Sequence, residues 1–139
     1  MDAALLSPYE NTSDCGVLYY SDEKVTEFCK AANRAGLQIE MHAIGDKAFV
    51  QAVRAIKAAL DDLPREDHRH TIIHACLPTA EEIAVCERYH INLAVQTAFI
   101  DWPQEPDSYL EQILGERAGR LNPIRTFCEH GLILSAGSD

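Results

Sequence analysis

The stretch LQIEMHAIGDKAFVQAVRAIKAAL, residues 37–60, combines two different hydrophobic periods. Polar and apolar residues alternate strictly over residues 37–43, which predicts a β-strand. Gly45 and Asp46 then turn the chain, and apolar residues follow at the spacing of one helix face: Phe49, Ala52, Val53, Ile56 and Leu60. A strand that leads directly into an amphipathic helix predicts one βα unit.

The same unit recurs along the rest of the chain. The other expected elements are a helix over residues 21–35, strands over 71–75, 92–99 and 132–137, and helices over 79–89, 108–120 and 123–130. Strands alternating with helices at this spacing predict an α/β fold with a parallel sheet and right-handed crossovers. Four such strands amount to half of a (β/α)8 TIM barrel. No linker rich in Pro, Gly or Ser interrupts residues 1–139, so we expect a single domain.

The composition narrows the functional classes. The formal net charge is -10 and the basic residues are scattered, so we expect neither nucleic acid nor a membrane surface as a partner. No apolar run approaches the roughly 20 residues that span a bilayer. Residues 1–10 have no basic start followed by an apolar core. The five cysteines, an odd number without the paired spacing of a zinc knuckle or a redox CxxC, fit reduced thiols better than a disulfide framework. We therefore expect a cytoplasmic protein.

The alternation of side chains across a strand assigns residues to the two faces of the sheet. A sheet buried on both faces would read as nearly continuous Val, Ile and Leu. Here one face carries polar residues, and we expect it to line the inside of the barrel. The sets on this face are Gln38, Glu40 and His42; His70, Ile72 and His74; Asn92, Ala94 and Gln96; and Ser135, Gly137 and Asp139.

His42, His74 and Asp139 then stand at the carboxyl ends of three strands, where barrel active sites are built. Two imidazoles and a carboxylate suit Zn²⁺ or a similar divalent metal, which acidifies a bound water. Asp139 could also act catalytically, as the general base that takes the proton of that water. Each of the three, taken alone, is more often a structural polar residue. Their shared position on separate strands favours a metal site.

Other residues carry weaker signals. Gln96 and Cys76 are candidate substrate-binding residues near the same strand ends, although packing explains Cys76 equally well. Trp102 and Arg117 could also contact substrate from the loop side, but for them and for Gln96 a structural role is the commoner one, and Gln96 is the best candidate of the three. Residues 67–70, Asp-His-Arg-His, look like a metal cluster, but they precede a strand and are expected at the opposite end in a structural or solvated role. Asp46 follows Gly45 at a helix start, where capping is the expected role.

Four motifs, in this order and spacing, carry a resemblance to a known family. They are His42-Ala43-Ile44-Gly45-Asp46, Arg69-His70-Thr71-Ile72-Ile73-His74-Ala75, Leu114-Gly115-Glu116-Arg117-Ala118 and Gly137-Ser138-Asp139. Together they resemble the amidohydrolase superfamily, in particular the subgroup of N-substituted formamide deformylase (amidohydrolase family 3). The resemblance extends from about Ala3 to the last residue.

The resemblance implies roles for three residues. His42 matches the ligand on the fifth barrel strand, His74 the ligand on the sixth, and Asp139 the aspartate on the eighth strand that activates water. The family's remaining ligands, on the first and a middle strand, have no counterpart here. The resemblance therefore implies that the chain corresponds to strands 5 to 8 and holds part of a site for one or two metal ions.

Two functional hypotheses follow. The first is a fragment of a metal-dependent hydrolase that cleaves non-peptide C–N bonds of a small-molecule amide, formamide or cyclic amide through a metal-activated water. Departures from the family pattern at Ile73, Cys76 and Thr97 leave the substrate class open. The second is a non-catalytic half-barrel without a complete metal site. Because the ligands of the first strand are missing, we expect the isolated chain to be inactive. Since half a barrel has two unpaired sheet edges, we also expect it to form homodimers or larger assemblies.

Overall fold

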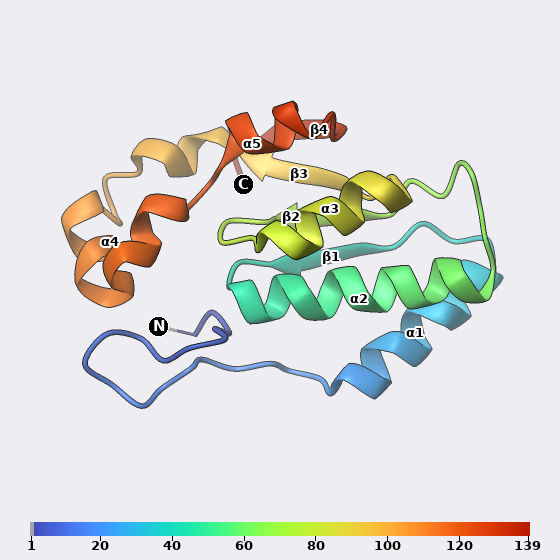
Figure 1. Ribbon diagram of the computed structural model, residues 1–139, viewed down its shortest axis with the longest axis horizontal. Helices are drawn as coiled ribbons and strands as arrows, with labels where there is room; N and C mark the ends of the chain where they lie inside the picture. Colours follow the sequence, from blue (N-terminus) through green and yellow to red (C-terminus); the bar gives the residue numbers. More distant parts are fainter. Residues whose placement is uncertain (1) are drawn as a thin grey trace.

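The computed structural model describes residues 2–139 and has one parallel sheet of four strands in the order β1-β2-β3-β4 (Figure 1). This confirms the predicted α/β class. The elements are α1 (Asp22–Arg34), β1 (Glu40–Ala43), α2 (Asp46–Asp62), β2 (Thr71–His74), α3 (Ala80–Tyr89), β3 (Asn92–Gln96), the 3-10 helix η1 (Thr97–Asp101), α4 (Asp107–Leu114), the 3-10 helix η2 (Gly115–Arg120), α5 (Ile124–Glu129) and β4 (Leu134–Gly137).

The two faces of the sheet differ in their covering. Apolar residues of all the helices except α4 and the 3-10 helices pack with strand residues such as Ile72 and Leu93 into one core, and both of these are fully buried. On the opposite face Glu40, His42 and Ser135 are exposed. The helices therefore stabilise one face by burying apolar surface, and the polar face stays open.

The phase of β2 corrects one sequence prediction. The sequence analysis placed His70, Ile72 and His74 on the open face. The register instead pairs Ile73 with His42 on one side and with Ala94 on the other, so Ile73 belongs to the open face. Ile72 lies in the helix-covered core. Within residues 70–74 each of the two alternating sets contains one isoleucine and at least one polar residue, so alternation alone could not fix the phase.

The amino ends of β1 and β2 are joined by a buried histidine. His70 Nδ1 accepts the backbone N–H of Ile39 at 3.1 Å, and Nε2 donates to Asn33 Oδ1 at 3.0 Å. Asn33, fully buried in α1, in turn donates to the carbonyl oxygens of Ala59 and Leu63 at 2.9 and 2.8 Å. His70 and His68 are therefore structural, as predicted for residues 67–70, whereas Asp67 and Arg69 form an exposed ion pair.

This network predicts a pH-dependent stability. Burial, together with the positive charges of His68 and Arg65, lowers the pKa of His70 to about 4, against about 6.5 in an unfolded chain. The neutral ring therefore stabilises the fold above pH 6.5, and this contribution is lost as the pH falls from 6.5 toward 4. We expect the fall to be on the order of 2 kcal/mol in the free energy of unfolding, from the size of the pKa shift.

Urea unfolding at several pH values between 7.5 and 4 would measure this effect. His70→Gln cannot titrate, so we expect it to be less stable at pH 7.5 and to lose less stability on acidification. His90→Asn is the control, because His90 is exposed and its left-handed backbone, φ 54, suits Asn. An unchanged acid dependence in His70→Gln would contradict the assignment.

The segment before α1 is irregular, as predicted, and it is held against the carboxyl ends of the strands. Gly45 provides the close approach: a Cβ there would lie 2.1 Å from the carbonyl oxygen of Ala4. The Asp46 carboxylate accepts the backbone N–H of Leu6 at 2.8 Å. Gly45, not Asp46, is the N-cap of α2, so the expected capping role of Asp46 is wrong. Its carboxylate fastens the N-terminal segment instead.

Element boundaries differ from the prediction for local reasons. β1 begins at Glu40, where its pairing with Thr71 of β2 begins, and the Arg65 side chain donates to the carbonyl oxygens of Gly36 and Leu37 before it. The helix expected over 108–120 is split into α4 and η2 at Gly115, which has φ 59. α4 and the N-terminal segment lie on the side toward which the strand arrows point (Figure 1). Within residues 2–139, no helix has the length and apolar character to cross a membrane.

Candidate metal centre

His42, His74 and Asp139 come together at the carboxyl ends of β1, β2 and β4. The rings of His42 and His74 meet edge to face, with centroids 4.4 Å apart and planes at 78°. His74 Nε2 lies 4.0 Å from Asp139 Oδ2. The structure thus brings the three predicted ligands to one rim of the sheet, and their role as ligands stays a prediction.

A left-handed turn carries His74 to this rim. β2 ends at His74, which has φ 75, and Ala75 follows with φ 50. This conformation costs roughly 1–2 kcal/mol for a residue with a Cβ, and such strain is concentrated at functional sites. Because the strand geometry ends here, the His74 ring contacts His42 and Gln96 although its neighbour Ile72 points into the helix-covered core.

Gln96, at the end of β3, contacts His74. His74 Nδ1 lies 2.6 Å from Gln96 Oε1, and both side chains are buried. Because an amide oxygen can only accept, Nδ1 must carry the proton. In the neutral ring this leaves a lone pair on Nε2, the nitrogen nearest Asp139. Gln96 therefore orients a candidate ligand, while its predicted contact with substrate stays a prediction.

Replacement of Gln96 should remove the interaction that fixes the tautomer of His74. In Gln96→Leu we expect a mixture of Nδ1–H and Nε2–H forms where the native protein has Nδ1–H. Gln96→Glu keeps an accepting oxygen and should keep the native form. Long-range ¹H–¹⁵N correlation spectra of the imidazole nitrogens distinguish the two tautomers, and Gln38→Leu, at an exposed site, is the control. An Nδ1–H form that persists in Gln96→Leu would contradict this role.

The electrostatics of the rim favour neutral imidazole at His42. Burial, followed by the charge of His74, lowers the pKa of His42, and the Asp139 carboxylate opposes this shift. A neutral imidazole offers a lone pair, which is the form that binds a metal ion. The ring of His42 is therefore in the form required of a ligand at neutral pH.

The rim opens into a cavity of about 500 Å³ whose wall includes all three candidate ligands and Cys76. Cys76 thus lies where a substrate contact was predicted, and that contact stays a prediction. Burial and the nearby charge of Glu105 raise the pKa of the Cys76 thiol to about 12. Its sulfur is therefore protonated at neutral pH and is no nucleophile.

One aromatic residue at the rim, Phe99, was missed as a site residue. Phe99 stacks on His74, with centroids 5.8 Å apart, and Trp102 stacks on Phe99. The sequence analysis placed Phe99 in a strand, whereas it considered Trp102 as a possible substrate contact from the loop side, and that contact stays a prediction. The two consecutive polar residues Gln96 and Thr97, after the apolar run of residues 93–95, were the available signal that this segment leaves the sheet.

The donor set fits a divalent metal ion by its chemistry, since imidazole nitrogens and a carboxylate bind Zn²⁺ at about 2.0–2.2 Å. Ligand atoms at such distances around a tetrahedral ion lie roughly 3.3 Å apart, and His74 Nε2 and Asp139 Oδ2 are 4.0 Å apart. Among residues 2–139, however, no group of three His, Cys, Asp or Glu side chains is arranged to hold an ion as it stands. The ligands present would have to close further on an ion.

Comparison with known proteins agrees with the geometry. A model of the amidohydrolase family matches residues 2–139. The chain belongs to the amidohydrolase family. It is 29% identical to YtcJ of Bacillus subtilis (strain 168) over 99% of its length and 28% identical to Protein LONG AFTER FAR-RED 3 of Arabidopsis thaliana over 94%. It covers 25% and 22% of these two proteins, so it spans about a quarter of the curated relatives that it matches.

Solved structures give the same result for the amidohydrolase fold. An uncharacterized metal-dependent hydrolase from Pyrococcus furiosus matches 99% of the chain with a TM-score of 0.80 and 26% identity, and the chain covers 27% of it. A second uncharacterized metal-dependent hydrolase, from Pyrococcus horikoshii OT3, matches with a TM-score of 0.77 and 25% identity; the match covers 96% of this chain and 26% of that one. These matches confirm the predicted fold class, part of a TIM barrel, and the resemblance to the amidohydrolase superfamily.

Proposed function

We propose that this chain supplies part of the active site of a metal-dependent hydrolase of the N-substituted formamide deformylase type. The enzyme would cleave a C–N bond of a small amide, formamide or cyclic amide. The observation that carries this proposal is the convergence of His42, His74 and Asp139 at the carboxyl ends of three parallel strands. The match to metal-dependent hydrolases from two Pyrococcus species supports it.

Each residue of the rim has a role in this reaction. His42, His74 and Asp139 would hold the divalent ion, which supplies Lewis acidity toward the amide carbonyl and the attacking water. Asp139 is exposed, so its Oδ2 can accept the proton of that water and pass it to the leaving nitrogen. Gln96 keeps the Nδ1 proton of His74 and so presents Nε2 to the site.

We propose further that the complete site needs ligands beyond these three. Two imidazoles and one carboxylate that are not already arranged around an ion give little affinity for a metal. The ligands are too few, and they are not preorganised. The isolated chain should therefore bind Zn²⁺ or a similar ion weakly and turn over no amide by itself.

Zinc binding tests this proposal. We expect the dialysed chain to retain far less than one zinc per molecule. In calorimetry, added Zn²⁺ should bind at least tenfold more weakly to His74→Ala than to the native chain, because a ligand is lost. His90→Asn, away from the rim, is the matched control. Stoichiometric zinc after dialysis, with sustained hydrolysis of N-formyl and N-acyl amines, would show that the chain alone is complete. Zinc affinity unchanged in His74→Ala would contradict the ligand assignment.

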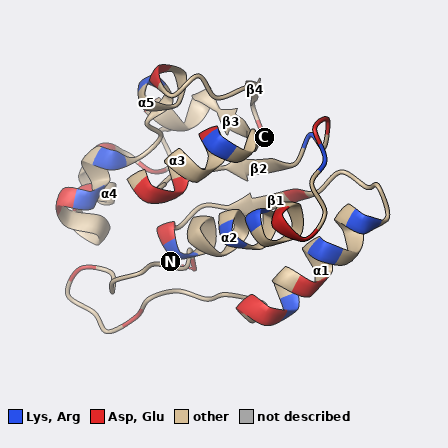
Figure 2. Cartoon of the chain, turned by 45° about the vertical axis from the view of Figure 1, so that its right-hand side comes forward, with Lys and Arg blue, Asp and Glu red and all other residues tan. Residues whose placement is uncertain are grey.

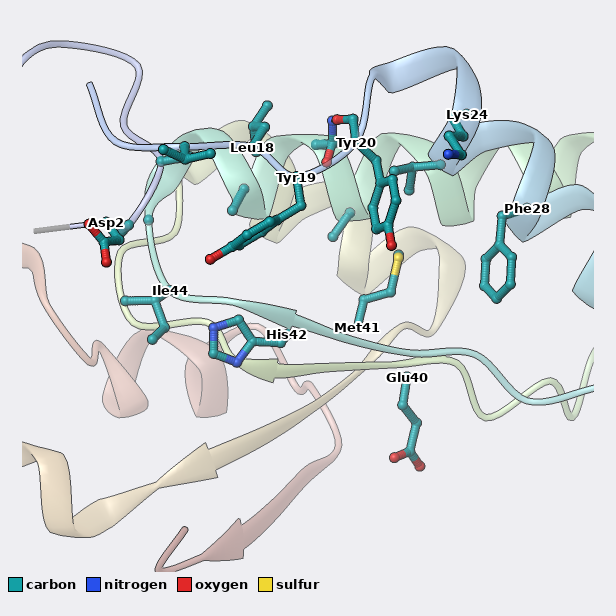
Figure 3. Close-up of a pocket in the computed structure, with 18 residues that line it drawn as sticks. Asp2, Leu18, Tyr19, Tyr20, Lys24, Phe28, Glu40, Met41, His42 and Ile44 are labelled. Atoms are coloured by element: carbon teal, nitrogen blue, oxygen red, sulfur yellow. The ribbon is translucent and has the colours of Figure 1, made fainter. Parts of the chain in front are cut away.

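A second candidate function is that of a non-catalytic half-barrel that self-associates, and the edges of the sheet favour it. β1 and β4 are the outer strands of a sheet whose strands all run parallel. Beside β1 lies a cavity of about 800 Å³ between Met41 and the side chains of Tyr19, Tyr20 and Phe28, seen in Figure 3. These aromatic residues are 85%, 58% and 64% exposed. Two copies related by a twofold axis could pair β1 with β4 twice and close an eight-stranded barrel.

The negative charge of each copy opposes this pairing, and it makes the association depend on the salt concentration. Each copy has a formal charge of -10, and its Lys and Arg residues are spread over α1, α2, α3, α5, η2 and the loop between α2 and β2 (Figure 2). Salt screens the repulsion between copies. We expect sedimentation to show self-association that is stronger in 500 mM than in 50 mM NaCl. Tyr19→Lys should weaken this self-association. Leu63→Lys, 42% exposed at the end of α2, is the control. A monomer at high concentration in both salts would rule out self-association.

A further inference from the structure

The outer edge of β1 lies between the two cavities of the molecule. His42 lines both the cavity of about 500 Å³ at the rim and the cavity of about 800 Å³ beside β1. Ile39 and Ala43 direct their carbonyl oxygens to β2, where these accept backbone N–H groups. Because the backbone groups of successive strand residues point to opposite edges, those of residues 40 and 42 face away from β2. A strand added at this edge would therefore end beside His42.

β4, the other outer strand, carries apolar surface that fits this position. Ala136 pairs in register with Val95, which is 4% exposed in the core, yet Ala136 itself is exposed. Leu134, next on the same side of β4, is only partly buried. Tyr20 and Phe28 stand beside β1 on its helix-covered side (Figure 3), and they are 58% and 64% exposed. The rings of one copy could therefore cover β4 of a second copy.

Closure of a barrel fixes how β4 of a second copy would align with β1. Four residues of the sheet, one on each strand, lie at one level: His42, Ile73, Ala94 and Ser135. An eight-stranded barrel of this type has a shear of about 8 residues, so two copies related by a twofold axis shift by about 4 residues at each junction. One direction of shift would place Ser135 beside residue 46, which is in α2. The other places it beside Gln38, and only this direction keeps the strands paired.

This register brings compatible side chains together on the open face. It forms three pairs between β4 of one copy and β1 of the other: Ser135 with Gln38, Gly137 with Glu40, and Asp139 with His42. A hydroxyl and an amide can hydrogen-bond. No atom lies within 4 Å of the position of a Cβ at Gly137, so the Glu40 side chain has room. Asp139 of the second copy would lie one strand spacing, about 4.8 Å, from the backbone of His42.

The candidate metal site is incomplete in a single copy. Zinc sites commonly hold four ligands in a tetrahedron. His74 Nε2 and Asp139 Oδ2 are 4.0 Å apart, and among residues 2–139 no three His, Cys, Asp or Glu side chains are arranged to hold an ion. The second copy would add a carboxylate on the other side of His42, as a fourth donor beside the three candidate ligands.

We propose that Zn²⁺ or a similar divalent ion joins two copies of this chain, with Asp139 of the second copy binding in trans an ion held by His42 and His74. The inference rests on the proposed ligand roles of these histidines and on the proposed pairing of two half-barrels. Metal binding and self-association then form one linked equilibrium, in which each strengthens the other.

Sedimentation with and without Zn²⁺ tests the linkage. We expect one equivalent of Zn²⁺ to lower the dissociation constant of the native dimer at least tenfold, and EDTA to reverse this change. Asp139→Asn removes the ligand in trans, so zinc should leave its self-association unchanged. Asp107→Asn is the matched control, because Asp107 is exposed and lies outside both cavities.

Mixing two variants distinguishes a ligand in trans from one within the same copy. The double variant His42→Ala, His74→Ala lacks both imidazoles, and Asp139→Asn lacks the carboxylate. Only a mixed dimer combines two imidazoles from one copy with a carboxylate from the other. We therefore expect an equimolar mixture to bind zinc at least fivefold more tightly in calorimetry than either variant alone. Circular dichroism shows whether each variant folds, and His42→Ala alone replaces the double variant if that one does not.

The outcomes separate this inference from the proposed function. Zinc bound by a monomer, zinc-dependent association that persists in Asp139→Asn, or a mixture that binds no more tightly than its parts would each overturn the inference. All three leave the ligand roles of His42 and His74 intact. A chain that binds no zinc at all would overturn both. Zinc-dependent dimers that Asp139→Asn abolishes, together with recovery in the mixture, would support the ligand in trans.

Discussion

The left-handed turn at His74 and Ala75 is the constraint on which the candidate site depends. β2 carries Ile72 into the helix-covered core, and continued strand geometry would have sent the polar ring of His74 to the same side. The turn releases the ring to the open face, where His42, Gln96 and Asp139 receive it. The hydrogen bond to Gln96 and the burial of the ring offset the cost of the backbone conformation. Within one short strand, Ile72 therefore packs in the core while His74 reaches the candidate site.

The two ends of the sheet have different tasks. At the amino ends, His70 and Asn33 join α1, α2 and two strands by neutral, fully buried hydrogen bonds. At the carboxyl ends, His42 and Asp139 are exposed at the rim. Histidines occur at both ends, and their surroundings rather than their type determine which are structural. This division between a stabilising face and a reactive face is general in (β/α) barrels.

Much of the architecture could be predicted from periodicity, because β1 and α2 have clear and different periods. The ends of strands bearing His42, His74 and Asp139 were predictable for the same reason. The phase of β2 was not, since each face of the strand could receive one isoleucine together with polar residues. Gln96 as a partner of His74 and Phe99 as a wall depend on side-chain directions after strands end, and no sequence period records these. Contacts between distant segments, such as Arg117 with Ser7, also leave no local pattern.

The contacts that hold the N-terminal segment against α4 and η2 determine which parts of the chain can change the cavity. Leu5 and Tyr9 pack against Leu77 and Leu114, while Arg117 holds the backbone over 109 residues of sequence separation. One wall of the cavity is thus assembled from the two halves of the chain. Lengthening the loop between α2 and β2, which contributes nothing to the lining, would leave the cavity unaltered, whereas a single inserted or deleted residue between Ala3 and Tyr9 would shift its boundary. Diversification of ligand preference among related chains should therefore be concentrated in this short stretch and in the loop after β3.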